Sequence, residues 1–163
     1  MSLGKGNAME ASKRNRRGDS RQVKLRGDVI RKRFERGGHK LQSVESYSEF
    51  FARVDARSEI LESRDWLSNK DDIYLVYCHL AGAGFQVEDV LNGQEARVHY
   101  ILATRGEESR TIVPVSIQVS ITPARIHSMI GERSEYQKEP EMTIAFVDSD
   151  SVNLMPVSPV ICK

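Results

Sequence analysis

The clearest hydrophobic pattern in the chain is a strict alternation of apolar and polar residues between positions 113 and 121. The apolar members are Val113, Val115, Ile117, Val119 and Ile121. A period of two residues puts them on one face, so the pattern predicts a β-strand with one buried and one solvated face. Pro114 has no backbone N–H, and we therefore expect the start of this strand to lie at a sheet edge or a bulge.

A hairpin is predicted before this strand. Asn92-Gly93 is a strong turn signal because both residues tolerate positive φ. Residues 96–102 follow it with a looser alternation of apolar and polar side chains, which favours a second strand of the sheet. A tight loop over 105–109 then connects this strand to the one that begins at 113.

The C-terminal part is predicted to contain a short helix and a last strand. Thr122-Pro123 gives the N-cap and first-turn signals of a helix, and Gly131 is expected to end it. The last strand begins with the alternating residues Met142, Ile144 and Phe146. Turns are expected at 148–150 and at Pro156.

Two helices are predicted before the sheet. Ser46 and Glu49 have the spacing of a capping box, in which each side chain bonds a free backbone N–H of the other residue. The apolar positions of this first helix are Val44, Tyr47, Phe51 and Val54. A second helical stretch carries Ile60, Leu61, Arg64 and Leu67. Trp66 lies near the end of that stretch.

An unbroken apolar run occupies residues 73–80, before a turn signal at Gly82-Ala83-Gly84. Its length and its β-branched and aromatic content favour a buried strand, with a core helix as the alternative. Taken together, the patterns predict an α+β fold. We expect an N-terminal basic arm and two early helices, followed by a mainly antiparallel β-sheet with one short crossing helix.

Charge is distributed unevenly along the 163 residues, whose formal net charge is +1. Residues 1–40 contain 13 Lys and Arg against four Asp and Glu, a net charge of +9, which leaves −8 on residues 41–163. Such asymmetry is typical of an arm that meets a polyanion. We therefore divide the chain at Gly37-Gly38, into a basic flexible arm (1–40) and a compact α+β domain (41–163).

The arm is the predicted binding site for a nucleic acid or an anionic surface. Its candidate contact residues are Lys13, Arg14, Arg16, Arg17, Arg21, Lys24, Arg26, Arg31, Lys32, Arg33 and Arg36. Val29, Ile30 and Phe34 fit one and a half turns of a basic amphipathic helix, and a disordered, solvated arm is the alternative. Arginine and lysine neutralise phosphate and release counterions, so binding is expected to be independent of sequence and sensitive to salt.

Candidate catalytic and metal-binding residues are sparse. The four histidines (His39, His79, His99 and His127) are isolated, and none has metal-ligand spacing to another His or to a Cys. Cys78 is interpreted as a core residue, and two cysteines 84 positions apart, Cys78 and Cys162, favour a reducing compartment. The sequence therefore predicts a protein that is not an enzyme and needs no cofactor or metal. A small hydrolase using His99 or His127 is the weakest alternative.

The layout of the chain resembles that of small structural proteins of RNA viruses. A basic arm ahead of a compact, acidic, β-rich domain is similar to rhabdovirus-type matrix proteins, and also to satellite-type coat proteins with an Arg-rich arm before a jelly roll. The resemblance covers the chain in outline and includes no signature motif. The arm lacks the Pro-Pro-x-Tyr budding motif of animal rhabdovirus matrix proteins. Because residues 41–72 look helical, too few remain for eight strands, and the matrix-like interpretation is favoured.

We accordingly expect a self-associating structural protein whose partners are RNA or ribonucleoprotein, or an anionic membrane surface, with no small-molecule substrate. An arm that reaches the acidic domain of a neighbouring copy would build open assemblies. The alternatives are a coat protein that packages RNA and a cellular RNA-binding regulator with a monomeric domain. The N-terminus has no secretory signal, and no apolar stretch reaches the ~18 residues of a spanning helix. An intracellular location is expected, in the host cytoplasm and the virion if the protein is viral.

Overall fold

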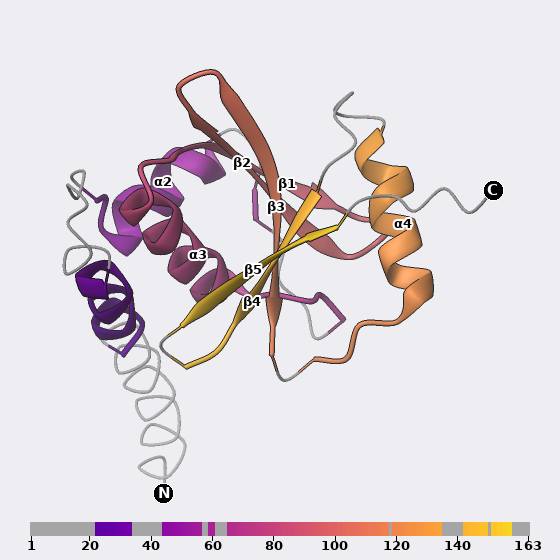
Figure 1. Ribbon diagram of the computed structural model, residues 1–163, viewed down its shortest axis with the longest axis horizontal. Coiled ribbons are helices and arrows are strands. Elements are labelled where there is room, and N and C mark those ends of the chain that lie inside the picture. Colours follow the sequence, from indigo (N-terminus) through magenta and orange to yellow (C-terminus); the bar gives the residue numbers. More distant parts are fainter. Residues whose placement is uncertain are drawn as a thin grey trace, which may run out of the picture.

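The computed structural model describes residues 22–33, 44–56, 59–60, 65–117, 119–134, 142–149 and 151–157. They confirm the predicted α+β class. A helix over 22–33 is followed by α2 (Tyr47–Asp55) and α3 (Lys70–Gly82), then by a five-stranded sheet with α4 (Pro123–Ser134) inserted between two of its strands. Figure 1 shows the sheet in the middle of the molecule, with α2 and α3 on one side and α4 on the other.

The sheet has the strand order β1-β2-β3-β4-β5. Its strands are β1 (Gln86–Gly93), β2 (Val98–Arg105), β3 (Glu108–Ser116), β4 (Met142–Val147) and β5 (Val152–Val157). Neighbouring strands are antiparallel except β3 and β4, which are parallel. Parallel neighbours need a crossover connection, and α4 supplies it. The predicted crossing helix in a mainly antiparallel sheet is thus confirmed.

The apolar run 73–80 lies in helix α3, so the strand favoured by the sequence was wrong and the helical alternative is correct. The helix begins with a reciprocal cap: the Asn69 side chain accepts from Asp72 N (2.9 Å), and the Asp72 carboxylate accepts from Asn69 N (3.0 Å). Nearly every residue of α3 is buried, because the other helices cover one side and the sheet covers the other. A helix buried all round has no polar stripe, and therefore no helical period in its sequence.

The turn predicted after α3 is confirmed, and the capping box predicted for α2 is confirmed in its first half. Ser46 is the N-cap of α2, and its hydroxyl accepts from Glu49 N (3.2 Å), whereas between these two described residues the return bond from Ser46 N to the Glu49 carboxylate is not formed. After α3, Gly84 takes a positive φ of 90° and Phe85 N donates to Leu80 O (2.9 Å). This is the geometry of a Schellman cap, in which a glycine in the left-handed region closes the helix.

The second predicted helix is not found in the described part of its segment. Ile60 and Leu67 are both buried, and both lie in non-helical backbone; Leu61 and Arg64 lie outside the described residues. Both residues are apolar because they are buried in the core, and their spacing along the sequence happens to match that of one face of a helix. Helical spacing over so short a stretch cannot separate a helix from an irregular segment that packs on a core.

Leu67 bridges two strands that separate at one end. Pairing of β3 with β2 stops at Ile112, and beyond it Leu67 N donates to Arg97 O (3.2 Å) while Leu67 O accepts from Ser116 N (2.9 Å). Pro114 therefore pairs through the ladder with β4 only. The predicted edge at the start of this strand was wrong, because β3 begins at Glu108 and lies in the centre of the sheet; Pro114 is tolerated there because its β2 side has no ladder partner.

Strand β3 ends at Ser116, earlier than the alternation predicted. Ile117 is 54% exposed and Val119 is 37% exposed, whereas both faces of 111–115 are buried. The half-buried strand over 113–121 was therefore wrong in both length and burial. Both faces of the strand are buried because helices cover both faces of the sheet. The predicted length was too great because the apolar alternation continues into a connecting loop.

The β1–β2 hairpin is present, but its turn is shifted. The turn lies at 94–97, and Asn92 and Gly93 still belong to β1, so the predicted turn position was wrong. Gly93 is required for space: a Cβ there would collide with the Tyr100 ring and the Glu132 carboxylate. The glycine that indicated a turn therefore serves close packing instead.

Helix α4 starts as predicted and runs further than predicted. The Thr122 hydroxyl accepts from Arg125 N (3.2 Å), as an N-cap does. The helix continues through Gly131 to Ser134, so the predicted end was wrong. Beyond the glycine, the buried Glu132 accepts hydrogen bonds from Tyr100 Oη and Glu95 N (both 2.8 Å), and these tertiary contacts hold the last turn.

The last two strands form a hairpin at one edge of the sheet. The strand predicted from Met142 onward is β4, and the turn predicted at 148–150 closes with Asp148 N donating to Ser151 O (2.9 Å). Pro156 is not in a turn: it lies within β5, opposite Thr143. An edge strand tolerates proline because its outer N–H has no ladder partner.

The two faces of the sheet carry separate cores. The α3 face, which includes Ile101, Ile112 and Ala145, packs with α2, α3 and the helix over 22–33. The α4 face, which includes Tyr100 and Ile144, packs with α4 around Met129 and with Leu67. In the described residues no helix is long and apolar enough to cross a membrane.

Candidate functional site

The helix over 22–33 lies in the segment predicted to be the arm, and it packs on the domain. Val23 and Ile30 are buried in the core of the α3 face. Gly27 lies between them, and a Cβ there would come within 2.9 Å of Cys78 Sγ on α3. These three positions share one face of the helix, so a small and apolar face docks it on α3. The boundary predicted at Gly37-Gly38 lies outside the described residues.

The opposite side of this helix is basic and partly apolar. Lys24, Lys32 and Arg33 are exposed there. Leu25 is 64% exposed and Val29 is 41% exposed, although the sequence analysis had assigned Val29 to the apolar face. We refer to these five residues as the basic helix face. Its cations are held on a fixed element, a geometry that suits phosphate contacts.

Two other predicted contact residues are engaged within the protein. Arg26 donates from Nη2 to Asp148 O (3.0 Å) and from Nε to Ser149 O, which ties the helix to the β4–β5 turn. Arg31 pairs with Asp28 (3.5 Å) on the same helix. The remaining six predicted residues lie outside the described part of the chain: Lys13, Arg14, Arg16, Arg17, Arg21 and Arg36. Of the described candidates, Lys24 and Lys32 are exposed, and Arg33 is exposed at the rim of a small cavity that it lines with His79 and Asn153.

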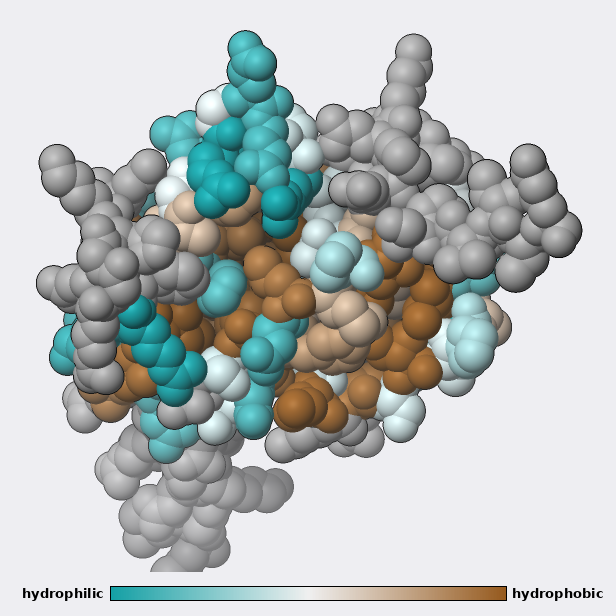
Figure 2. All heavy atoms as spheres, viewed as in Figure 1, coloured by the Kyte–Doolittle hydropathy of each residue, from teal (hydrophilic) through white to brown (hydrophobic). Residues whose placement is uncertain are grey.

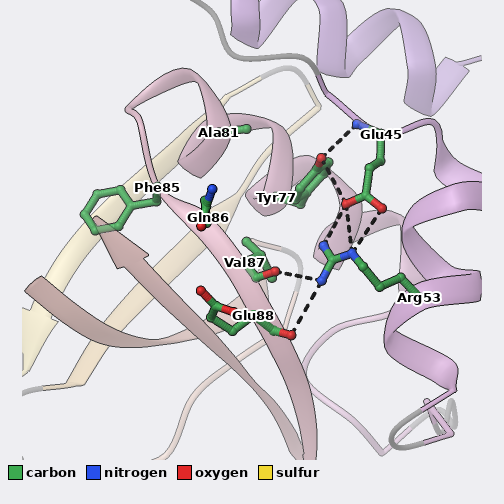
Figure 3. A pocket seen from close by; sticks show the side chains of 8 residues that line it. All are labelled: Glu45, Arg53, Tyr77, Ala81, Phe85, Gln86, Val87 and Glu88. Atoms are coloured by element: carbon green, nitrogen blue, oxygen red, sulfur yellow. Dashed lines mark hydrogen bonds and ion pairs between the residues drawn. The ribbon is translucent and has the colours of Figure 1, made fainter. Parts of the chain in front are cut away.

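A cleft of about 320 Å³ lies between α2, α3 and the start of β1 (Figure 3). At its centre, the Arg53 guanidinium donates to the Glu45 carboxylate (Nη2–Oε1 2.7 Å) and to Val87 O (Nη1–O 2.9 Å). Glu45 N donates to Tyr77 Oη (2.8 Å). The hydrogen bond to Glu45 raises the pKa of Arg53, and burial raises the pKa of Tyr77.

The groups in this cleft bind one another. Figure 3 shows the Arg53 guanidinium turned toward Glu45 and the β1 backbone rather than toward an open space. The raised pKa values keep the arginine charged and the tyrosine neutral, so neither group is poised to transfer a proton near neutral pH. The arrangement clamps α2 to the edge of the sheet, and no pattern in the sequence pointed to these residues.

A serine and a histidine form a buried pair under the only tryptophan of the chain. Ser68 Oγ lies 3.0 Å from His99 Nδ1, and the Trp66 ring stacks on the imidazole with 4.7 Å between centroids. This spacing is that of a nucleophile and its base. His99 is completely buried and Ser68 nearly so, which leaves no path for a substrate to reach them. The pair therefore supports the segment that bridges β2 and β3.

The other described histidines and the described cysteine do not form a pair of nucleophile and base either. His127 is exposed on α4, and His79 lies on α3, where burial lowers its pKa to about 4. Cys78 is in the core as predicted, and burial raises its pKa to about 12, so it stays a thiol rather than a reactive thiolate. Within the described residues, His, Cys, Asp and Glu form no group of three that could hold a metal ion. His39 and Cys162 lie outside those residues.

The spacing Val23–Gly27–Ile30 is the signal that could have revealed the docked helix from sequence, because four- and three-residue steps mark one helical face. In comparisons with known proteins, no family model and no curated protein sequence matches the chain.

Proposed function

We propose that this protein is a non-enzymatic structural protein that binds RNA or ribonucleoprotein through its basic N-terminal segment and self-associates through its domain. It is proposed to act inside cells, in the host cytoplasm and the virion if it is viral. The proposal assigns the segment 1–40 to the polyanion and the α+β domain to the assembly.

The docked basic helix is the observation that carries this proposal. Because Val23, Gly27 and Ile30 face the core, the side chains of Lys24 and Lys32 are exposed on the surface of the docked helix. The segment before them adds six more Lys and Arg within residues 1–21. A fixed row of cations continued by further basic residues can track a phosphate backbone without reading its sequence.

The domain supports a structural rather than a catalytic role. Its described nucleophile candidates, Ser68 and Cys78, are buried, and the charged side chains of the cleft, Arg53 and Glu45, pair with each other. The described strands form one five-stranded sheet, unlike the two-sheet jelly roll of the coat-protein alternative. Matrix-like assembly is therefore proposed ahead of RNA packaging by a coat protein, and a monomeric regulator is the remaining alternative.

The test compares two pairs of charge removals in the full-length protein. Lys24→Gln/Lys32→Gln removes two charges from the basic helix face. The matched control, Arg97→Gln/Arg105→Gln, removes two exposed charges from the domain, where they pair with Asp65 and Glu108. Binding to single-stranded RNAs of mixed sequence is measured by fluorescence anisotropy across a range of salt concentrations.

The helix variant should bind all the RNAs more weakly, and its slope of log K against log salt should fall by about 1.4, at ~0.7 per phosphate contact. The control should retain the wild-type slope. Equal slopes for wild type and helix variant would contradict the proposal, as would a control that loses as much as the helix variant.

An anionic membrane surface is a second candidate, favoured by the exposed apolar residues Leu25 and Val29. A helix that lies in a lipid interface presents apolar residues flanked by cations, as this one does. Leu25→Ser/Val29→Ser should leave RNA binding unchanged. If it instead reduces co-sedimentation with phosphatidylserine vesicles, and wild type binds the vesicles more tightly than RNA, the membrane is the partner.

A further inference from the structure

The two edges of the sheet differ in how they are protected. The β1 edge is closed: Arg53 Nη1 donates to Val87 O (2.9 Å), and the ladder is irregular between Val87 and Asp89. Glu88 and Asp89 add charge to the same strand. Capping groups, bulges and charges are the usual devices that stop an edge from pairing with another chain.

The β5 edge has fewer of these devices: Pro156 near its end, and the docked helix near its start, where Ile30 and Arg33 line a cavity beside Val152. The strand Val152–Val157 contains no charged residue. In the part of the chain that the structure describes, Val152, Leu154 and Pro156 have ladder partners in β4 and none on the other side of β5. Figure 2, drawn in the same view as Figure 1, shows hydrophobic side chains gathered in the middle of this side of the molecule, over β4 and β5. Met155 of β5 is 45% exposed.

The hydrogen-bond phase of the hairpin shows which backbone groups face outward. Asp148 N donates to Ser151 O, so these two residues form a hydrogen-bonded pair at the turn. Pairs alternate along an antiparallel ladder, and the opposite pairs Val147–Val152, Ala145–Leu154 and Thr143–Pro156 are therefore of the non-hydrogen-bonded kind. The N–H and C=O groups of residues 152 and 154 then point away from β4, together with the C=O of residue 156.

We propose that β5 pairs with β5 of a second copy of this chain, antiparallel about a two-fold axis at Leu154. The two Leu154 residues exchange two backbone hydrogen bonds, and Val152 N–H of each copy donates to Pro156 O of the other. The missing N–H of Pro156 faces only Val152 O at the ends of this ladder, where strands can separate. The pattern is self-complementary, as an isologous contact requires, and it joins two five-stranded sheets into one.

The side chains of β5 also fit a second copy. Residues 153 and 155 lie opposite each other in this register, so Asn153 of each copy meets Met155 of the other on the α4 face. Neither position carries charge, and both are exposed. The strand therefore offers a second copy two uncharged, exposed side chains at the centre of the new ladder.

This inference deepens the self-association in the proposed function and rests on it. It differs from an arm that reaches a neighbouring domain by charge, because strand pairing survives screening. At about 1 M salt the Debye length is only ~3 Å, so charge-driven contacts are suppressed. Sedimentation equilibrium of the full-length, nucleic-acid-free protein at this salt should show monomers and dimers without larger species.

Two double variants test the register itself. Asn153→Lys/Met155→Lys puts like charges opposite each other twice across the two-fold axis, and Asn153→Glu/Met155→Lys puts opposite charges there. Both variants change the same two exposed positions, so each controls for the fold of the other. The like-charge variant should dimerise about tenfold more weakly than wild type, and the opposite-charge variant at least as tightly as wild type.

A wild-type protein that stays monomeric at every concentration would overturn the proposal. So would equal dimerisation of the two double variants. RNA binding measured on the same samples separates this result from the proposed function. If the wild-type protein binds RNA but forms no dimers, only the strand pairing is contradicted. If the wild-type protein does not bind RNA, the assignment of the basic segment to a polyanion is contradicted.

Discussion

The two faces of the sheet are built in different ways. On the α3 face, three helices share one continuous core, and α3 itself is buried on nearly every side. On the α4 face, one helix covers the sheet, and Ile117, Val119 and Met155 remain exposed beside the region it covers. The α3 face therefore provides most of the stability of the fold, and the exposed apolar residues of the α4 face are where we expect other molecules to bind.

Breaking the core of the α3 face should have the largest effect. Ile73 on α3 is completely buried, so Ile73→Ala should lower the free energy of unfolding by about 2–5 kcal/mol through lost burial and a cavity. Urea denaturation followed by circular dichroism measures the change. A loss below that of an ordinary surface substitution would show that α3 is not the centre of the core.

The α3 face should also lose stability in acid. Because burial lowers the pKa of His79 from 6.5 to about 4, the unfolded state binds the proton more readily between these values. Stability from His79 is thus complete above about pH 6.5 and is lost as the pH falls toward 4, by up to ~3 kcal/mol.

Urea denaturation at several pH values tests this on two matched variants. His79→Gln should flatten the dependence of stability on pH between 4 and 6.5. His127→Gln, at an exposed position of α4, should retain the wild-type profile. Identical profiles for wild type and both variants would remove His79 as the cause.

On the α4 face a single polar contact should matter. Tyr100 Oη donates to Glu132 Oε1 (2.8 Å), and both residues are buried. Tyr100→Phe removes this donor and leaves the carboxylate with the N–H of Glu95 as its other described donor. We expect a loss of about 1–3 kcal/mol, measured by thermal denaturation. Glu132→Gln, which can still accept from the tyrosine, should cost less than Tyr100→Phe.

The smallest effect is expected at the open part of the α4 face. Ile117 is 54% exposed, so Ile117→Ala should change the free energy of unfolding by less than ~0.5 kcal/mol. A loss of stability as large as that of Ile73→Ala would erase the distinction between the two faces.

Local signals were predicted well from the sequence. Ser46 and Thr122 cap their helices through neighbouring backbone groups, and the start of β4 at Met142 follows a short alternation. These features depend on residues within a few positions of one another. The fold class followed from them because each local choice agrees with the final architecture.

Features that depend on packing from several sides were missed. The helix α3 lost its period because it is buried all round, although the pair Asn69 and Asp72 carried a local helix signal. The alternation that ends with Ile117 and Val119 continued past the strand, since nothing local marks where β3 leaves the sheet. Burial of both faces of a strand is a tertiary property.

The candidate site was predicted only in part. The concentration of charge in residues 1–40 is visible in the sequence, but the roles of single cations are not. Arg26 binds carbonyl oxygens of the β4–β5 turn, more than 120 positions along the chain, whereas Lys24 and Lys32 are exposed on the same helix. The way the helix docks therefore determines which cations make contacts within the protein and which remain exposed.

Because Gly27 packs against Cys78, the reactivity of the Cys78 thiol can report how often the helix over 22–33 separates from α3. Cys78 is buried against the N-terminal helix, so a thiol reagent can modify it only during excursions in which that helix lifts away. In a Cys162→Ser background, the slow rate of labelling divided by the rate for an unfolded thiol equals the equilibrium constant for lifting. A polyanion that binds the helix preferentially in its undocked state would accelerate this labelling. A polyanion that contacts both the docked helix and the domain would slow it.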